Sequence, residues 1–433
     1  MSARDPRDIL DHAVMSRFQW GVVAIMVGLN ALDGFDVLSI SFASPGIAAA
    51  WGIDRAALGL VLSMELIGMA AGSLILGGAA DRFGRRPTIL ACLVVMATGM
   101  FGASSAYDVV SLSAWRVLTG LGIGGMLATT NAAVAEVSSL ARRNLAVVLM
   151  AGGYPVGAVI GGAISAELLR AFDWRAVFMF GGIATLLFIP LVLWRSPESI
   201  AFLAQRGGRD ALLRINRTLM RMGHAPASTL PEPAARPRVP VAQLFAPALA
   251  RRTAALTIAY FAHIMTFYFI LKWIPKIVVD MGFAPASAAG VLVWANVGGA
   301  CGSLLLGLLT ARLRLAPLTI AAMLASTVII VLFGQGQSTL FRLSLIAAAA
   351  GFCTNAGVVG LYALVARAFP TDVRASATGF VIGVGRGGSA LAPAIAGLLF
   401  AAGHGLSTVA ALMAAGSLIG AAAVALIGRD AAP

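Results

Sequence analysis

Two carboxylates stand close together in a stretch that otherwise lacks charge. The segment LNALDGFDVLS places Asp33 and Asp36 three residues apart, which puts them on one face of a helix. A carboxylate at the centre of a membrane helix costs about 2.5–3.5 kcal/mol on insertion scales, so its presence indicates a function. Burial favours the neutral form of a carboxyl group. We therefore predict that the pair takes up and releases protons; the alternative is a structural ion pair with a buried arginine.

Three cations lie in equally apolar segments and could bind an anion. Arg116 lies in AWRVLTGLGIGG, Arg386 in IGVGRGGSALAP and Lys272 in FILKWIPK. A guanidinium group matches a carboxylate with two parallel hydrogen bonds, so we expect both arginines to contact an anionic substrate. For Arg116, an ion pair with Asp33 or Asp36 is the alternative. Lys272 is a further substrate-binding candidate.

Other polar groups share these apolar segments. His263, in AYFAHIMTFYF, aligns with Asp33 at an offset of 230 residues, which makes it a candidate for proton coupling. An interior histidine held by hydrogen bonds is the alternative. Asn355 and Tyr362 are expected to line the substrate site, where a planar ring could stack on an aromatic side chain. Glu65 is a buried acid without a partner that the sequence identifies.

Membrane-spanning helices must position these groups. Of the 433 residues, 59% are hydrophobic and 11% are charged, against about 25% charged in soluble domains. Apolar runs of about 20 residues recur, the length that crosses about 30 Å of hydrocarbon. We predict spans at about 18–43, 57–79, 87–106, 109–135, 144–170, 174–194, 253–279, 287–310, 316–335, 340–366, 374–402 and 405–428.

The charges between the spans predict the topology. The net charge is +13, and the loop 195–252 contains ten arginines against three acids. Positive loops stay in the cytoplasm, so we place this loop and both termini there, in a bacterial cytoplasmic membrane. The first 17 residues lack the apolar region of a signal peptide. The predicted divisions are a tail 1–17, a bundle 18–194, a linker 195–252 with a flexible Pro-rich stretch 231–240, a bundle 253–428 and a tail 429–433.

The two halves repeat each other. GGAADRFGRRP (77–87) aligns with GLLTARLRLAP (307–317), and Arg143 and Gly157 fall on Arg374 and Gly388 at an offset of 231. We predict an all-α fold of two six-helix bundles, related by a pseudo-two-fold axis along the membrane normal, as in transporters that rock two bundles about a central site. No metal-ligand cluster, nucleophile elbow or phosphate loop is recognisable, so we expect no enzyme activity, cofactor or nucleic-acid partner, and a monomer in the lipid bilayer.

Three segments carry a resemblance to a known family. GGAADRFGRR (77–86) resembles the loop 2–3 signature of the major facilitator superfamily, and RVLTGLGIG (116–124) and GGYPVGAVIGG (152–162) are similar to its helix four and helix five patterns. The resemblance covers the whole chain. It implies a charged cluster that holds the cytoplasmic side shut in one state; the residues predicted for it are Asp81, Arg82, Arg85, Arg86, Glu136 and Arg142.

A narrower resemblance is to the aromatic acid:proton symporters of that superfamily. It rests on DGFD (33–36), SPES (196–199) and FPTDVRASATGFVIGVGRGG (369–388). It implies proton-driven uptake of benzoate-type acids, with roles for Asp33, Asp36, Arg116 and Arg386. Lys272 departs from the family pattern and suits a dianion or a bulkier aromatic acid. Import of a non-aromatic acid such as muconate and proton-antiport efflux of drugs are the alternatives, and two deep arginines disfavour efflux.

Overall fold

The computed structural model describes residues 5–207, 209–230 and 241–427. Twelve helices in this part of the chain are long and apolar enough to cross a membrane, which confirms the predicted number of spans. They are α2 (Arg17–Trp51), α3 (Arg55–Phe83), α4 (Arg85–Ser104), α5 (Val109–Val137), α6 (Arg143–Ala171), α7 (Arg175–Arg195), α10 (Pro247–Asp280), α11 (Pro285–Leu309), α12 (Leu315–Gly334), α13 (Leu340–Ala368), α14 (Thr371–Ala401) and α15 (Leu406–Ile427).

The ends of α2 show where local sequence fixes a helix and where it misleads. Ser16 and Gln19 form a capping box, in which each side chain accepts a hydrogen bond from the other residue's backbone N–H, and the helix begins there. The predicted end at residue 43 is too early. The helix continues through Pro45 and stops at Gly52, whose φ of 60° suits glycine. A proline is tolerated because neighbouring groups satisfy the freed carbonyl in a packed membrane protein.

Small residues bring α3 and α5 into close contact. A Cβ atom at Gly120 or Gly124 of α5 would collide with the backbone carbonyl of Glu65 or Met69 in α3. Such glycines let two membrane helices approach closely and replace lipid contacts with packing. Arg116 lies one turn before Gly120, so the same contact places its side chain beside that of Glu65.

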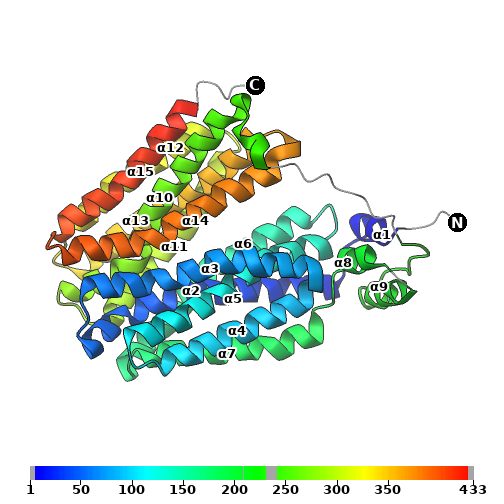
Figure 1. The fold of residues 1–433 in the computed structure, drawn as a ribbon, viewed down its shortest axis with the longest axis horizontal. Coiled ribbons are helices and arrows are strands. Elements are labelled where there is room, and N and C mark those ends of the chain that lie inside the picture. The colour runs from blue at the N-terminus through cyan, green and yellow to red at the C-terminus, as the bar shows by residue number, and fades with distance from the viewer. Residues whose placement is uncertain (1–4, 208, 231–240, 428–433) are drawn as a thin grey trace.

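The two six-helix halves, α2–α7 and α10–α15, meet at one end and separate toward the other (Figure 1). At the end where they meet, a Cβ atom at Gly59 of α3 would lie only 2.5 Å from the carbonyl oxygen of Pro393 in α14. Toward the other end, a Cβ atom at Gly78 of α3 or at Gly379 of α14 would have no neighbour within 4 Å. We name these ends the closed side and the open side.

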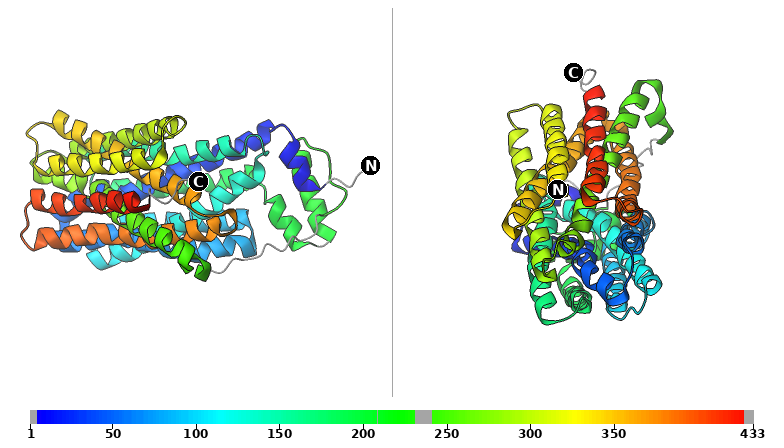
Figure 2. Two further views of the ribbon diagram at one scale, coloured as in Figure 1. Left: turned by 90° about the horizontal axis from the view of Figure 1, so that it is seen from above. Right: turned by 90° about the vertical axis from the view of Figure 1, so that its left-hand side faces the viewer.

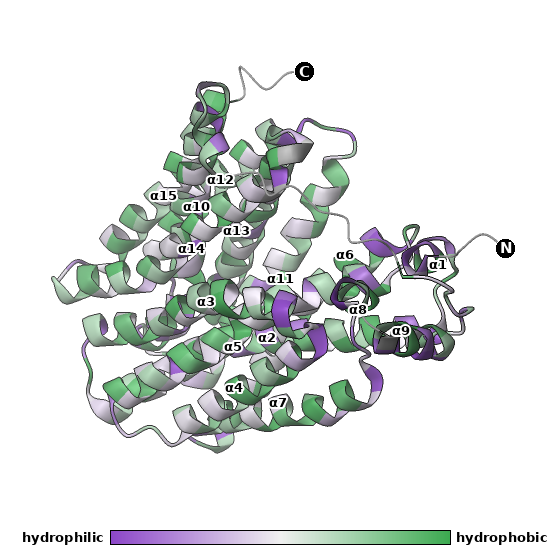
Figure 3. Cartoon of the chain, turned by 45° about the vertical axis from the view of Figure 1, so that its right-hand side comes forward, coloured by the Kyte–Doolittle hydropathy of each residue, from purple (hydrophilic) through white to green (hydrophobic). Residues whose placement is uncertain are grey.

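The predicted tail 1–17 and linker 195–252 contain helices that the sequence analysis treated as loop. They are α1 (Pro6–His12), α8 (Ile200–Arg206), α9 (Arg209–Arg221) and the 3-10 helix η1 (Val241–Phe245). The first three extend beyond the spans on the open side (Figure 2), and α1 and α9 carry hydrophilic residues beside apolar ones (Figure 3).

These short helices pack on the first half through single apolar faces. Ile215 and Leu219 of α9 are fully buried, and Leu10 of α1 is 4% exposed; all three belong to the core that includes Met26 of α2. Apolar residues four positions apart lie on one face of a helix, and in α9 this face is buried. The sequence analysis missed it because α9 is rich in arginine. The Pro-rich stretch 231–240 and the tail 429–433 lie outside the described residues.

Candidate functional site

Asp33 and Asp36 lie at the middle of α2 and are 1% and 0% exposed. Within the described ranges, none of their four carboxylate oxygens has a hydrogen-bond partner. A Cβ at Gly34 would collide with the backbone carbonyl of Tyr154 in α6, and a Cβ at Gly181 of α7 would lie 3.2 Å from an Asp36 carboxylate oxygen. The acids are thus enclosed by close helix contacts. Because an ionised carboxylate without partners is costly there, this pair is suited to binding protons.

Arg116 is completely buried and its partners all belong to the first half. It forms an ion pair with Oε1 of Glu65, and its Nη2 donates a hydrogen bond to the backbone carbonyl of Asp36 at 3.0 Å. Nη1 lies 3.2 Å from Sδ of Met100, and the guanidinium group faces the ring of Phe178. The alternative predicted from the sequence, an ion pair with an aspartate carboxylate of α2, is therefore not the arrangement found: the carboxylate partner is Glu65.

Lys272 reaches from α10 of the second half into the first half. Its Nζ lies 3.2 Å from Oε2 of Glu65 and also donates a hydrogen bond to the backbone carbonyl of Val37 in α2. Lys272 exposes no surface. The other lysine, Lys276, lies one turn nearer the closed side and pairs with Asp280. The sequence left Glu65 without a partner, whereas the structure gives it two cations.

Arg386 lies at the middle of α14 beside a group of tyrosines. Its Nη1 donates a hydrogen bond to the backbone carbonyl of Met69 across the two halves, at 3.3 Å, and the ring of Tyr260 of α10 lies against Gly385, the residue before Arg386. The hydroxyl oxygens of Tyr260 and Tyr362 are 3.0 Å apart. Tyr362 is 41% exposed. Arg386 itself retains some exposed surface, so a cation and several phenol groups remain together in this part of the second half.

His263 and Asn355 are engaged within the second half. The Nδ1 atom of His263 lies 2.9 Å from Oγ of Ser417, and its Nε2 atom lies 2.9 Å from the carbonyl of Thr354. Both ring nitrogens thus have partners, and Asp33 is not among them. This geometry is that of the interior histidine that the sequence analysis offered as the alternative. Asn355 is half-buried and donates to a backbone carbonyl of its own helix at 3.1 Å.

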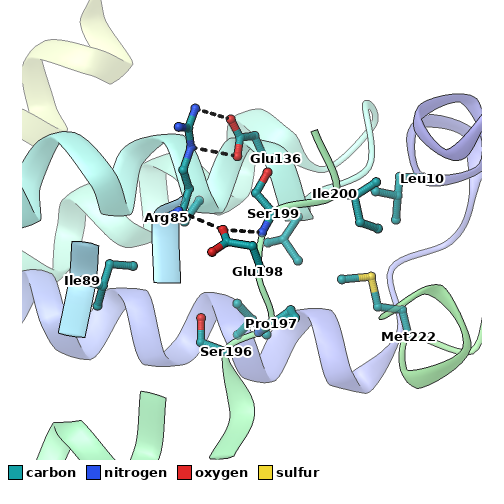
Figure 4. Close-up of a pocket in the computed structure, with 13 residues that line it drawn as sticks. Leu10, Arg85, Ile89, Glu136, Ser196, Pro197, Glu198, Ser199, Ile200 and Met222 are labelled. Atoms are coloured by element: carbon teal, nitrogen blue, oxygen red, sulfur yellow. Dashed lines mark hydrogen bonds and ion pairs between the residues drawn. The ribbon is translucent and has the colours of Figure 1, made fainter. Parts of the chain in front are cut away.

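Arg85 organises a cluster of charges on the open side of the first half (Figure 4). Its Nη1 binds Asp81 at 2.8 Å, and Nη2 and Nε donate hydrogen bonds to the two carboxylate oxygens of Glu136 at 3.0 and 3.3 Å. This fork matches a planar guanidinium group to a planar carboxylate. Three of the residues predicted for the charged cluster are therefore in contact through Arg85, and all three belong to the first half.

Glu198 completes this cluster and was not predicted as a site residue. Its Oε1 accepts hydrogen bonds from the backbone N–H groups of Arg85 at 2.8 Å, Arg86 at 3.4 Å and Ser199 at 2.8 Å. Helix α4 has no side-chain cap from its own N-cap residue, Gly84. A carboxylate from the segment after α7 therefore caps α4, where unpaired N–H groups attract negative charge. The quoted segment SPES contains this residue, but no local signal connects it with α4.

The other predicted gate residues have different surroundings. Arg86 donates from Nη2 to the backbone carbonyl of Leu193 at 2.6 Å. Arg82 and Arg142 are exposed and form no ion pair with another described residue. Arg143, the neighbour of Arg142, instead pairs with Asp11 of α1. In this structure Arg143 rather than Arg142 ties the loop after α5 to the rest of the open side.

Twelve spanning helices in two halves that enclose buried ionisable groups define a polytopic membrane transporter. The model of the Major Facilitator Superfamily matches residues 26–348. The chain belongs to the major facilitator superfamily. Its fold is similar to the partially occluded inward open conformation of the xylose transporter XylE from E. coli, with a TM-score of 0.73 and 17% sequence identity over 96% of this chain and 98% of that one.

Curated relatives that match nearly the whole chain are transporters of aromatic acids. A gallate transporter of Pseudomonas putida is 29% identical over 94% of this chain and 92% of its own length. A 4-hydroxybenzoate transporter of Acinetobacter baylyi is 30% identical, with 90% and 86% covered. A 3-(3-hydroxy-phenyl)propionate transporter of Escherichia coli is 30% identical, with 99% and 97% covered. The predicted resemblance is confirmed, and the class is a transporter and not an enzyme.

Proposed function

We propose that the chain imports an aromatic carboxylate together with protons, by alternating access across a bacterial cytoplasmic membrane. The names of the relatives support the substrate class. The arginine-bearing helices α8 and α9, which follow α7, lie on the open side (Figure 1), and positive segments stay in the cytoplasm. With that orientation both termini are cytoplasmic, and the state described here is open toward the cytoplasm.

The observation on which the proposal depends is the burial of Asp33 and Asp36 without hydrogen-bond partners in the described structure. Ionised carboxylates in such an environment would have to be paired. Two neutral, proton-bearing acids need no counter-ion, and burying them without hydrogen bonds costs far less than burying two unpaired charges. These residues are therefore the proton carriers of the proposal, whereas His263, whose ring nitrogens both have partners, serves the packing of the second half.

Arg386 is the proposed substrate contact. It retains exposed surface and lies beside tyrosines that offer both ring faces and hydroxyl groups. A substrate carboxylate would pair with the guanidinium group, and its ring would pack against Tyr268 and Tyr362. Asn355 stands on the same helix as Tyr362 and supplies a polar group for a ring hydroxyl.

Charge balance favours the coupling of an anion to a proton. Among the described residues, three carboxylates and three cations occupy the spans in this region: Asp33, Asp36, Glu65, Arg116, Lys272 and Arg386. The three cations balance the three carboxylates when both aspartates have released their protons. A monoanion that binds then adds one negative charge, and a proton on an aspartate offsets it. The pH gradient thereby contributes to accumulation, and each further proton, which carries net charge, adds about 2.3 kcal/mol per 100 mV.

Uptake into proteoliposomes with an inward proton gradient tests the proposal. Radiolabelled 4-hydroxybenzoate, gallate, 3-(3-hydroxyphenyl)propionate, benzoate and muconate would be compared in the wild type. Asp33→Asn should abolish pH-driven accumulation, whereas Asp8→Asn, at an exposed position of α1, should leave it unchanged. Undiminished accumulation by Asp33→Asn would refute the proton-carrying role. Proton-driven accumulation inside inverted vesicles, whose lumen corresponds to the periplasm, without uptake under the inward proton gradient, would favour the efflux alternative.

A second variant tests the substrate contact. Arg386→Gln should raise the KM for the transported acid about tenfold or more, because a charged hydrogen bond contributes about 1.5–3 kcal/mol. Arg342→Gln removes an exposed arginine near the start of α13 and is the matched control. Equal KM values for the two variants would exclude Arg386 from substrate binding.

A further inference from the structure

Glu65 is the central member of a group that the proposed transport cycle has not yet used. It is 0% exposed and lies near the middle of α3. Oε1 pairs with Arg116 of α5 and Oε2 with Nζ of Lys272 in α10. We name Glu65, Arg116 and Lys272 the ion triad. Its three side chains expose no surface.

The two cations of the ion triad are also fixed to α2. Lys272 donates to the carbonyl of Val37, and Arg116 donates to the carbonyl of Asp36 at 3.0 Å. A helical carbonyl oxygen has a second lone pair and can accept such a bond in addition to its own. The ion triad therefore touches the backbone of the proton-carrying segment from both halves.

The members of the ion triad come from different halves. Glu65 and Arg116 belong to the first half, and only Lys272 belongs to the second. Within the described ranges the other ion pair that joins the halves, Arg55 with Asp280, is partly exposed on both members. The contact of Lys272 with Glu65 is thus the fully buried ionic link between the halves. It lies deeper than the pair at the closed side, since Lys272 precedes Asp280 by two turns of α10.

The ion triad contains one more positive than negative charge. Arg116 is bound to the same half as Glu65 and keeps it as a partner when the halves move apart. Lys272 would then be left as a buried ammonium group without a counter-ion, which is a costly state. The carboxylate of a substrate can replace Glu65 as the counter-ion of Lys272, because it has the same charge and the same two oxygens.

We propose that Glu65 is an internal competitor of the substrate carboxylate for Lys272. In the alternative state, in which the halves separate at the side that is closed here, Lys272 binds the carboxylate of the transported acid. In the state described here, Glu65 has replaced it, and the substrate is released toward the open side. The inference rests on the proposed function, since it requires a carboxylate substrate. It assigns Glu65 a role in release and Lys272 a role in capture.

Binding and flux should respond in opposite directions to loss of Glu65. The probe is 4-hydroxybenzoate, with 4-hydroxybenzamide as its neutral analogue, measured by equilibrium binding to purified protein in nanodiscs and by uptake into proteoliposomes. Glu65→Gln should bind 4-hydroxybenzoate about tenfold more tightly, which is the scale of one charged hydrogen bond, while its net uptake slows. A purely structural role would weaken both.

Lys272→Met should weaken 4-hydroxybenzoate binding about tenfold or more, for the same reason. In the double variant E65Q/K272M the affinity should equal that of K272M, because the competition needs Lys272. Binding of the amide should not distinguish the variants. Where Glu65→Gln does not fold, Glu65→Asp withdraws the carboxylate from Lys272 without removing charge, and it should shift binding in the same direction.

One outcome is that the wild type binds 4-hydroxybenzoate while E65Q and E65D bind it no more tightly. That result would refute the competition between Glu65 and the substrate, and it would leave the proposed function intact. Wild-type affinity in K272M would do the same. Absence of binding and uptake of every aromatic acid by the wild type would instead refute the proposed function, and the competition with it.

Discussion

Arg55 of α3 and Asp280 at the end of α10 form an ion pair of 2.9 Å that joins the two halves at the closed side. Asp280 also pairs with Lys276 of its own helix. When the halves separate there, Asp280 therefore keeps one cation and only Arg55 loses its partner. Because Asp280 keeps a counter-ion in both states, breaking the ion pair with Arg55 leaves no unpaired carboxylate, so the pair can break and form again during the transport cycle.

Arg55→Gln should shift the equilibrium modestly toward opening of the closed side. The side chains are 43% and 29% exposed, and such pairs contribute about 0–1 kcal/mol, so a change of about threefold in the ratio of states is expected. The alkylation rate of a cysteine introduced at Ile277, beside this pair, in a background without the three native cysteines, measures it. The control is Arg175→Gln, whose ion pair with Asp173 stays within the first half. Equal rates in the two variants would contradict the expectation.

Gly34→Ala should destabilise the first half. The added Cβ would meet the backbone carbonyl of Tyr154, and forcing one methyl group into a packed interior costs about 1–3 kcal/mol. Thermal unfolding in detergent should therefore show a lower midpoint than in the wild type. Gly152→Ala is the matched control, since its Cβ would meet no atom within 4 Å. A wild-type midpoint for Gly34→Ala would show that α2 and α6 can separate at little cost.

Glu198→Ala should weaken the start of α4 by about 1 kcal/mol, as loss of a helix cap generally does. Glu198→Gln should cost less, because an amide oxygen can still accept the hydrogen bonds while only the interaction with the helix dipole is lost. Unfolding midpoints of the two variants measure this order. Glu167→Ala, which removes an exposed pair with Arg170, serves as control. The reverse order would mean that Glu198 does not act as a cap.

His224 should make stability depend on pH at the open side. Its Nε2 lies 3.1 Å from Oε1 of Gln19, and burial of the ring lowers the pKa of His224. The folded protein thus favours the neutral ring. Its contribution is complete above the ordinary histidine pKa of about 6.5 and is lost as the pH falls from there toward the lower pKa of the folded state.

His224→Gln should therefore lose less stability than the wild type between pH 8 and pH 5.5, as followed by thermal unfolding in detergent. His404→Gln changes an exposed histidine in the loop between α14 and α15 and should follow the wild-type profile. A parallel profile for His224→Gln and the wild type would show that the ring titrates equally in both states.

Much of the fold could be predicted because its signals are local. Each span is a continuous apolar run, so length and composition locate it without reference to the rest of the chain. The errors arose where a local signal was ambiguous. A proline ends many helices of soluble proteins, but α2 continues through Pro45. In α9 the many arginines made the sequence look like a loop, although Ile215 and Leu219 form a buried face.

The candidate site could be predicted only as a set of residue types. The placement of Asp33 and Asp36 on one buried face of α2 follows from their spacing, and the structure agrees. The partner of Arg116 does not follow from spacing. Glu65 precedes it by 51 residues, and the two side chains meet because glycines let α3 and α5 approach closely.

The sequence by itself determined that this chain crosses a membrane repeatedly, which side chains bear charge within the spans, and which superfamily it resembles, because hydropathy and motifs are read along the chain. Only the tertiary structure decided that Lys272 of one half meets Glu65 of the other and that Glu198 caps α4. The physical reason is that an ion pair depends on distance in space, and helix packing between remote segments sets that distance.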